Sequence, residues 1–341
     1  MDPGRILYSK FLTDHICIYS FALIYNESMN RNDNILEYVA ELYYDRGLSQ
    51  QEIGSIIGAS RPTVSRLIED AKRQGVVKIV IETSVSKNHK LSNKLRKAFG
   101  LRDAVVVGSD FDFDKSIDIC GKAAAILISA FLEPGMTIGV SWGRSINSFI
   151  NAIDEGVFDG VNVAQMVGCM TMGNPAIDGF SAAQRLARKM HGTYTSINSP
   201  LFVYGDEVYN YLINEPMLHD ALLNASKVDV CVNGIGSMND ARNAVHQSGY
   251  FDSYNLSRFQ EKGAVASFSG RYIGLDGREI EVENIHSISV PLEDVRKVPL
   301  SIVLNATAEK AEATLAVLNG GYADILIVDE ALAEKLLEFK K

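Results

Sequence analysis

The sequence predicts two domains, a small all-α domain of helix-turn-helix type followed by a larger, mostly parallel-sheet α/β domain. Residues 48–69 contain two short helical patterns separated by a glycine turn. From residue 103 onward, apolar runs of strand length alternate with amphipathic helical patterns. Such alternation is typical of a parallel sheet with helices on both faces. The length of 341 residues accommodates both domains.

The first helical pattern of the small domain has a recognisable start and end. Ser49, followed three residues later by Glu52, is a capping box, which predicts a helix beginning at Gln50. Gly58 supplies the positive φ that ends this helix. Gly54 lies in the helix interior, where glycine costs about 1 kcal/mol relative to alanine, so we expect a close crossing with the next helix there. The apolar face is formed by Ile53, Ile56 and Ile57.

The second helical pattern predicts the part that contacts DNA. Ser60 is suited to cap this helix, and Pro62 is tolerated only in its first turn. Its inward positions recur at helical spacing and are Val64, Leu67, Ile68 and Ala71. Its outward positions carry hydroxyl and guanidinium groups, which bind base edges and phosphates. We predict DNA contacts by Ser60, Arg61, Thr63, Ser65 and Arg66.

The alternative interpretation of residues 48–69 is a helical hairpin with a solvated, charged outer face. The charge distribution favours DNA. The whole chain has a net charge of −9, yet residues 60–78 carry five basic and two acidic side chains, a net +3. A locally basic segment on an acidic chain suits salt-sensitive contact with a particular double-stranded site, and does not suit general coating of nucleic acid.

The composition is that of a globular protein, with 47% hydrophobic and 22% charged residues. The four cysteines are far apart and show no metal-ligand spacing, so we expect neither a metal site nor a cofactor. We interpret them as reduced residues of a cytoplasmic protein. They are Cys17, Cys120, Cys169 and Cys231.

Residues 1–28 form a segment of doubtful status. Residues 6–25 are rich in apolar side chains, but Lys10, Asp14 and His15 interrupt them. The segment is too broken for a membrane-spanning helix and has no secretory cleavage pattern. We expect no membrane association, and we interpret residues 1–28 as a dispensable extension or a misassigned start.

Three further parts follow this extension. Residues 29–82 form the helix-turn-helix domain, with an added helix at 35–44 and a strand at 76–82 that suits a small wing. Residues 83–100 combine a polar linker with a helix that Gly100 ends. Residues 101–341 form the α/β domain. Its expected strands lie at 104–107, 137–140, 161–167, 228–235, 300–305 and 325–328, and its expected helices include 117–132, 181–190 and 309–318.

The candidate ligand site follows the strand at 137–140. A short loop, Ser141-Trp-Gly-Arg-Ser145, leads into a helix expected at 146–153. Free backbone amides at a helix start bind anions, and Arg144 adds a guanidinium suited to phosphate. The alternative is an ordinary strand-to-helix turn. Trp142, the single tryptophan, is suited equally to stacking on a ligand and to filling a gap beside the sheet.

Three other loops follow strands at the same expected edge of the sheet. Gln165 is suited to bind a ligand hydroxyl, or equally to be buried with backbone partners. The loop at 233–237 contains two glycines that allow close approach of the backbone to a ligand. Lys310 lies in the first turn of a helix after a strand, where a solvated surface lysine is the alternative.

Together these features resemble the SorC family of sugar-responsive bacterial transcription regulators. The resemblance covers about residues 35–339 and rests on the order and spacing of several segments. Besides the helix-turn-helix, they are residues 99–101, 137–145, 187–192, 199–202, 234–237, 263–265, 310–312 and 326–329.

The resemblance implies an effector domain of sugar-phosphate isomerase-like fold, a phosphorylated sugar as effector, and a homodimer or homotetramer. By position, the family's phosphate-binding loop corresponds to Ser141, Trp142, Gly143, Arg144 and Ser145. Lys310 corresponds to the family's lysine near the ligand. We therefore predict a regulator of carbohydrate metabolism whose affinity for operator DNA responds to the effector. We expect a repressor that its effector releases, because ligand binding can readily spoil the half-site spacing; an activator is the alternative.

The chain departs from the family pattern at two places. After residues 263–265 the family typically shows Gly-Asp, and here Ala266 and Ser267 occur. Before the Glu-Lys pair the family usually has Gly-Gly, and here Asn305 and Ala306 occur. An acid suited to gripping sugar hydroxyls is therefore missing, and a loop expected near the ligand is bulkier.

The alternative function is an enzyme of similar fold, a sugar-phosphate isomerase or deaminase. That chemistry needs a carboxylate or histidine base beside the phosphate. Ser267 replaces the most obvious acid, and no pattern places Asp178 or Asp229 at the site. A DNA-binding recombinase is a weaker alternative, because no clustered carboxylates indicate a nuclease metal site.

Overall fold

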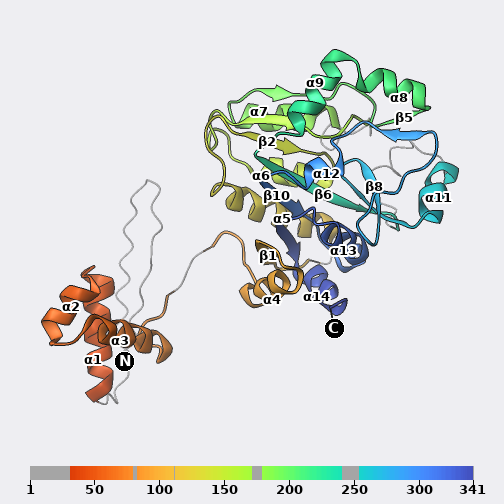
Figure 1. Ribbon diagram of the computed structural model, residues 1–341. Helices are drawn as coiled ribbons and strands as arrows, with labels where there is room; N and C mark the ends of the chain where they lie inside the picture. Colours follow the sequence, from red (N-terminus) through yellow and green to blue (C-terminus); the bar gives the residue numbers. More distant parts are fainter. Residues whose placement is uncertain (1–30, 80–82, 111, 171–178, 240–252, 341) are drawn as a thin grey trace, which may run out of the picture. The chain divides into compact units, whose positions relative to one another are not determined.

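The computed structural model describes residues 31–79, 83–110, 112–170, 179–239 and 253–340. The chain divides into two compact units, residues 1–84 and residues 85–341 (Figure 1). The expected extension at 1–28 lies outside the described residues.

The described part of the first unit is helical. Its elements are α1 (Arg31–Ala40), the π-helical turn η1 (Glu41–Asp45), α2 (Gln50–Ile57) and α3 (Arg61–Arg73). The helix expected at 35–44 is therefore present, although its last turn is wider than an α-helix. The core of this unit is made by Val39, Leu42, Ile53, Val64 and Ile68.

The capping predictions for α2 and α3 are confirmed. Ser49 donates its backbone N–H to Glu52 Oε2 at 2.8 Å, and Glu52 donates its own N–H to Ser49 Oγ at 3.3 Å. Gly58 ends α2 with a φ of 67°. The Oγ of Ser60 accepts the N–H of Thr63 at 3.4 Å, which places Pro62 in the first turn of α3. Local sequence signals thus define both helices of the pair.

Three expectations for this unit need correction. A Cβ on Gly54 would lie 2.6 Å from the carbonyl oxygen of Ala59 and 3.7 Å from Val64, so the turn rather than the helix crossing requires this glycine. Ile56 was expected on the buried face, but its side chain is 52% exposed. Residues 76–79 form no strand, and the remainder of the expected wing, 80–82, lies outside the described residues.

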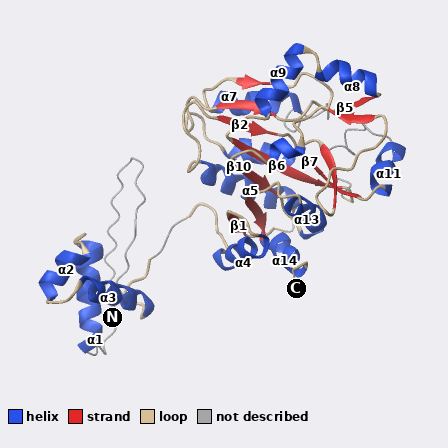
Figure 2. Ribbon diagram, viewed as in Figure 1, coloured by secondary structure: helices blue, strands red, loops and turns tan. Residues whose placement is uncertain are grey.

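The second unit is a mixed α/β structure built on a nine-stranded sheet (Figure 2). Its strands are β1 (Asp103–Val107), β2 (Thr137–Val140), β3 (Asn162–Gln165), β4 (Tyr194–Thr195), β6 (Val230–Ser237), β7 (Ala264–Phe268), β8 (Arg271–Gly274), β10 (Leu300–Leu304) and β11 (Ile325–Asp329). A separate antiparallel pair joins β5 (Phe202–Tyr204) to β9 (Ile285–Ser287). All six expected strands are present, with ends shifted by at most two residues.

The sheet is mostly parallel, as the sequence predicts. Its main path runs β1-β11-β10-β6-β2-β3-β4, and every neighbouring pair along it is parallel. The exception is a hairpin of β7 and β8, which pairs antiparallel with the end of β6. The strand β6 therefore continues from the parallel sheet into the hairpin.

Helices cover both faces of this sheet. The described helices of the unit are α4 (His89–Phe99), α5 (Phe113–Ile128), α6 (Arg144–Ala152), α7 (Gly179–Lys189), α8 (Asp206–Ile213), α9 (Pro216–Ala225), α11 (Ser253–Glu261), α12 (Leu292–Val295), the 3₁₀ turn η2 (Ala308–Lys310), α13 (Ala311–Asn319) and α14 (Glu330–Glu338). None of the helices in the described ranges is both long and apolar enough to cross a bilayer.

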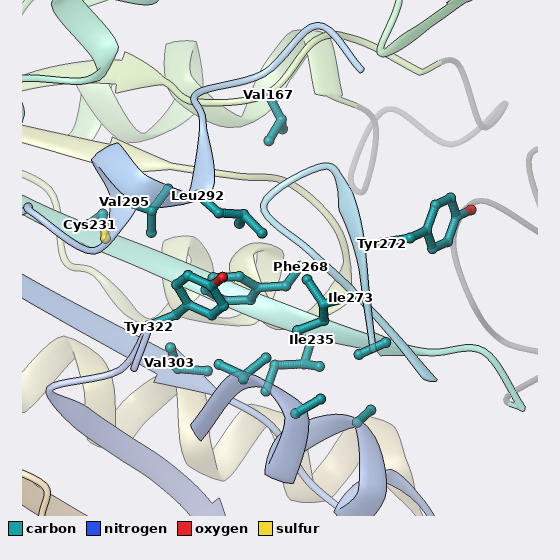
Figure 3. Packing of buried hydrophobic residues seen from close by; sticks show 14 of the residues in the cluster. Val167, Cys231, Ile235, Phe268, Tyr272, Ile273, Leu292, Val295, Val303 and Tyr322 are labelled. Atoms are coloured by element: carbon teal, nitrogen blue, oxygen red, sulfur yellow. The ribbon is translucent and has the colours of Figure 1, made fainter. Parts of the chain in front are cut away.

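The two faces of the sheet carry separate hydrophobic cores. One core includes Val230 and Val232 with side chains from α5, α6 and α7. The other includes Cys231, which points to the opposite face, and side chains from α4, α13 and α14. Figure 3 shows part of this second core, where the rings of Phe268 and Tyr322 are stacked with centroids 5.6 Å apart. The alternation along β6 thus explains its continuous apolar sequence.

Candidate functional site

The candidate anion-binding site lies where β2 ends and α6 begins. Gly143 adopts a φ of 112°, a conformation that L side chains rarely adopt, and turns the chain into the helix. The helix α6 starts at Arg144, two residues before the expected start at 146. Its N-cap residue, Gly143, has no side chain that could accept the first-turn N–H groups. A helix start of this kind is suited to bind an anion, and Arg144 and Ser145 lie within its first turn.

A pocket opens at this helix start, on the carboxyl side of the parallel strands. Segments that are far apart in the chain contribute to it: the loop before α6, the ends of β6 and β7, the turn between β7 and β8, the loop after β3, the start of β5, the start of α5, and η2. Ligands of parallel sheets bind on this side. The pocket is lined by Phe113, Ser141, Trp142, Gly143, Arg144, Ser145, Val167, Leu201, Phe202, Gly234, Ile235, Gly236, Ser267, Phe268, Ser269, Gly270 and Lys310.

The structure brings six of the seven predicted effector contacts into this pocket. The loop residues 141–145 and Lys310 all line it, although Lys310 is 165 residues beyond Ser145 in the chain. Lys310 is only 5% exposed, so it is not the solvated lysine of the alternative interpretation. Its Nζ lies 3.4 Å from the carbonyl oxygen of Ile235 and 4.3 Å from the centre of the Phe113 ring.

Phe113 is a lining residue that the sequence did not indicate. Its ring lies at the start of α5 and is almost completely buried. The guanidinium carbon of Arg144 lies 5.2 Å from the ring centre, so Arg144 and Lys310 both lie against the same ring. Contacts of this kind are worth about 0.5–1 kcal/mol at exposed sites and more when desolvated. Phe113 therefore contacts both of the cations among the described lining residues.

Trp142 fills the gap beside the sheet end while also lining the pocket. Its indole Nε1 donates a 2.9 Å hydrogen bond to the carbonyl oxygen of Gly168, which follows β3. The ring packs against both hydrophobic cores. This contact ties the loop before α6 to the neighbouring strand end.

Gln165 is the one predicted effector contact that does not line the pocket. Its side chain is buried, and Nε2 donates to the carbonyl oxygen of Val167 at 2.6 Å and to Cys169 Sγ at 3.2 Å. This arrangement matches the alternative of a buried glutamine with a backbone partner for Nε2, whereas Oε1 has no hydrogen-bond partner among the described residues. The glycine loop after β6 does reach the pocket, through Gly234, Ile235 and Gly236.

The two departures from the family pattern have different surroundings. Ser267 lines the pocket. Asn305 does not, because its Nδ2 donates to Thr314 Oγ1 at 2.9 Å and its Oδ1 accepts the N–H of Ala306 at 3.0 Å. The expectation of a bulkier loop beside the ligand is therefore wrong for Asn305, whose side chain is turned into the fold.

The segment between Asn305 and Lys310 has a strained backbone. Thr307 adopts a φ of 71°, which is unusual for a β-branched residue. Its N–H donates to both carboxylate oxygens of Asp329 at 3.2 Å. Burial raises the pKa of Asp329, and the hydrogen bonds that it accepts oppose this shift. Asp329 also caps α14 by accepting the N–H of Leu332 at 3.0 Å.

The predicted DNA contacts lie on the outer side and at the start of α3. Arg61, Thr63 and Arg66 are exposed, whereas Ser65 is half-buried. Ser60 is exposed but also structural, since its Oγ caps the helix and lies 2.8 Å from Thr63 Oγ1. Lys72 and Arg73 lie in the last turn, and Arg73 pairs with Asp70 at 2.6 Å. The outer face of α3 therefore presents cations and hydroxyls along its length.

The described residues contain no group of histidine, cysteine and carboxylate side chains that could hold a metal ion. Cys120 and Cys231 are buried thiols. Burial raises the pKa of Cys231 to about 12 and that of Cys120 well above its usual range. Neither thiol is therefore activated as a nucleophile.

Comparisons with known proteins agree with this architecture. Residues 83–338 match the sugar-binding domain family, and residues 34–86 match the Crp-like helix-turn-helix domain. The chain is 27% identical over 322 residues to the uncharacterized transcriptional regulator YjhU of Escherichia coli, covering 92% of this chain and 96% of that protein. It is 27% identical over 311 residues to the transcriptional regulator LsrR of an Enterobacter species, covering 89% and 93%.

A solved structure has the same fold. The full-length sorbitol operon regulator SorC of Klebsiella pneumoniae superimposes with a TM-score of 0.67 at 24% identity, covering 91% of this chain and 100% of that one. The chain belongs to the sugar-binding domain family and, within it, to the SorC family of transcription regulators. It is a DNA-binding regulator with an effector domain, and not an enzyme.

Proposed function

We propose that this chain is a repressor of genes of carbohydrate metabolism and that a phosphorylated sugar bound at the start of α6 controls its affinity for operator DNA. The observation that supports phosphate binding is the start of α6. Gly143 provides no side-chain cap there, Arg144 lies in the first turn, and Lys310 lines the same pocket. Backbone amides and a guanidinium are suited to bind a phosphate dianion.

The DNA contacts that we propose are those of Ser60, Arg61, Thr63, Ser65 and Arg66. They lie in the helix that such a motif places in the major groove. One such helix reads one half-site, so we propose a homodimer or homotetramer that binds a two-fold related operator. The protein would then act in the cytoplasm, where its DNA is.

Ligand control requires that the effector bind two arrangements of the regulator with different affinity. We infer that the bound sugar phosphate favours an arrangement whose two reading helices no longer match the half-site spacing. The effector would therefore release the repressor from DNA.

The experiment that tests this function measures binding of the full chain to the DNA upstream of its own gene by fluorescence anisotropy, with and without sugar phosphates. Arg144→Ala should bind this DNA normally but lose the response to effector. The matched control is Arg278→Ala, which removes one charge from a side chain that is 87% exposed. A normal response by Arg144→Ala would place the phosphate elsewhere, and no preference for upstream DNA over random duplex would exclude the function.

A further inference from the structure

The hairpin of β7 and β8 brings its turn to the pocket. Phe268 and Arg271 pair across the hairpin, so Ser269 and Gly270 alone form the connection. Both turn residues line the pocket, and Ser269 is only 3% exposed. Connections between strands usually lie on the protein surface. A turn that is buried beside a pocket is therefore placed to contact the ligand of that pocket.

The backbone of this turn does not suit its first residue. The φ angle is 48° at Ser269 and 76° at Gly270. Two-residue hairpin turns with positive φ at both positions strongly prefer Asn-Gly, Asp-Gly or Gly-Gly, because most L residues are strained there. Gly270 follows this preference, and Ser269 does not. Backbone strain of this kind is concentrated at functional sites such as ligand pockets, so it indicates a role for the serine side chain.

Contacts of Gly270 fix the position of the turn. A Cβ on Gly270 would lie 2.8 Å from Cδ1 of Leu201 and 3.1 Å from Cγ1 of Val167, so the backbone packs closely against both side chains. The carbonyl oxygen of Gly270 accepts a 2.7 Å hydrogen bond from the hydroxyl of Ser287. The neighbouring Ser269 is therefore held at a defined place in the pocket lining.

The hydroxyl of Ser269 is not used within the fold. Its Oγ is buried and has no hydrogen-bond partner among the described residues. Buried polar groups are nearly always hydrogen-bonded, because an unpaired one lowers stability. A ligand in the pocket can supply the missing partner. Since a serine hydroxyl is neutral and both donates and accepts, the matching ligand group is a hydroxyl or a carbonyl oxygen.

We propose that Ser269 is a specificity-determining residue, whose hydroxyl binds a neutral oxygen on the carbon skeleton of the effector. Val167 and Leu201, which the turn contacts, are apolar lining residues, so they cannot replace this hydrogen bond. A site built to hydrogen-bond a ligand hydroxyl rejects an analogue without it, because the protein group is then left unpaired. This inference rests on the proposed binding of a sugar phosphate in the same pocket.

The experiment measures binding to the full chain by calorimetry, with glucose 6-phosphate, fructose 6-phosphate, ribose 5-phosphate and inorganic phosphate. Inorganic phosphate has only the group that we propose to bind at the start of α6. Ser269→Ala removes the hydroxyl and keeps the Cβ, whereas Ser269→Gly also relieves the backbone strain. Both variants should bind the preferred sugar phosphate about tenfold more weakly. Their affinity for inorganic phosphate should equal that of the unaltered chain.

Asn284→Gly is the matched control. Asn284 has a φ of 63° and is not among the described lining residues of this pocket, so this variant should bind every compound normally. Unchanged binding of the sugar phosphate by Ser269→Ala would overturn the inference and leave the proposed function in place. A loss confined to Ser269→Gly would also contradict it, because backbone flexibility would then be the cause. An equal loss for inorganic phosphate would mean a structural role, and binding of no phosphate compound to the unaltered chain would remove both proposals.

Discussion

The side chain of Asn88 donates a 2.8 Å hydrogen bond from Nδ2 to Oε1 of Glu330, 242 residues later in the chain. Asn88 also caps α4 through its Oδ1, which accepts the N–H of Leu91 at 3.0 Å. Glu330 is the first residue of α14, directly after Asp329. Through Asp329 and Thr307, the start of α4 is thus joined by hydrogen bonds to the segment that carries Lys310.

This connection predicts a variant that binds effector without responding to it. Glu330→Ala removes the acceptor for Asn88 while leaving every lining residue of the pocket unchanged. We expect effector affinity within about twofold of normal and a loss of coupling of about 1 kcal/mol or more, because allosteric couplings are typically 1–3 kcal/mol. Calorimetry measures the effector affinity. Fluorescence anisotropy of DNA with and without effector measures the coupling. Glu330→Gln keeps an acceptor and should respond normally; equal responses by the two variants would contradict the connection.

Arg66 predicts a specific loss in DNA binding. Arg66→Ala removes an exposed guanidinium from α3, and a bidentate contact to a base is worth about 1–3 kcal/mol. We expect operator affinity to fall by roughly tenfold or more, with normal effector binding. Arg46→Ala is the matched control, because Arg46 is an exposed cation of the same unit outside α3, paired with Glu41 at 2.9 Å. If the two variants lost affinity equally, general electrostatics rather than α3 would explain binding.

The close approach of Gly234 to Ser145 predicts that a larger residue at position 234 disturbs the phosphate site. A Cβ at this position would lie 3.0 Å from Cβ and 3.2 Å from Oγ of Ser145, in the first turn of α6. Gly234→Ala should therefore displace Ser145 and weaken phosphate binding, by roughly tenfold if one charge-assisted hydrogen bond is lost. Gly108→Ala, with no atom within 4 Å of the added Cβ, should bind normally. The two variants are compared by thermal shift with glucose 6-phosphate or another sugar phosphate that binds. Unchanged binding by Gly234→Ala would contradict phosphate binding at the start of α6.

Ser49 predicts the local stability of the DNA-binding unit. Ser49→Ala removes the side chain that accepts the N–H of Glu52, and loss of such a cap costs about 1 kcal/mol. Hydrogen exchange of amides at residues 50–57 in the full chain should accelerate by roughly fivefold. Ser55→Ala is the control on the same helix, since the Ser55 hydroxyl donates only to the carbonyl oxygen of Gln51. Unchanged exchange in Ser49→Ala would mean that packing alone holds the helix.

The sequence predicts the helix-turn-helix well because its signals are local. Ser49, Glu52, Gly58 and Ser60 act on amides within a few residues of themselves, so spacing alone indicates the caps. Ile56 is an exception. Helical spacing assigns it to the apolar face, but burial depends on which neighbour covers the side chain, and Ile56 is exposed.

The pocket is less predictable because distant segments form it. The loop 141–145 is indicated by its position between strand and helix. The position of Lys310 after a strand is equally compatible with a solvated surface lysine, and only the family resemblance favours a place near the ligand. Phe113 and Ser269 were missed, since only the strand order brings the start of α5 and the end of β7 to the same place. Gln165 lies at the expected strand end, but its side chain direction depends on the backbone around it.

Trp142 has a practical consequence that follows from its hydrogen bond to Gly168. It is the single tryptophan of the chain, and it lines the pocket beside Arg144. Its indole is therefore a built-in spectroscopic reporter, because every change in tryptophan emission of the unlabelled protein originates at this one loop. Binding in the pocket can be followed by the intrinsic tryptophan fluorescence, in the presence of DNA, without attaching a dye.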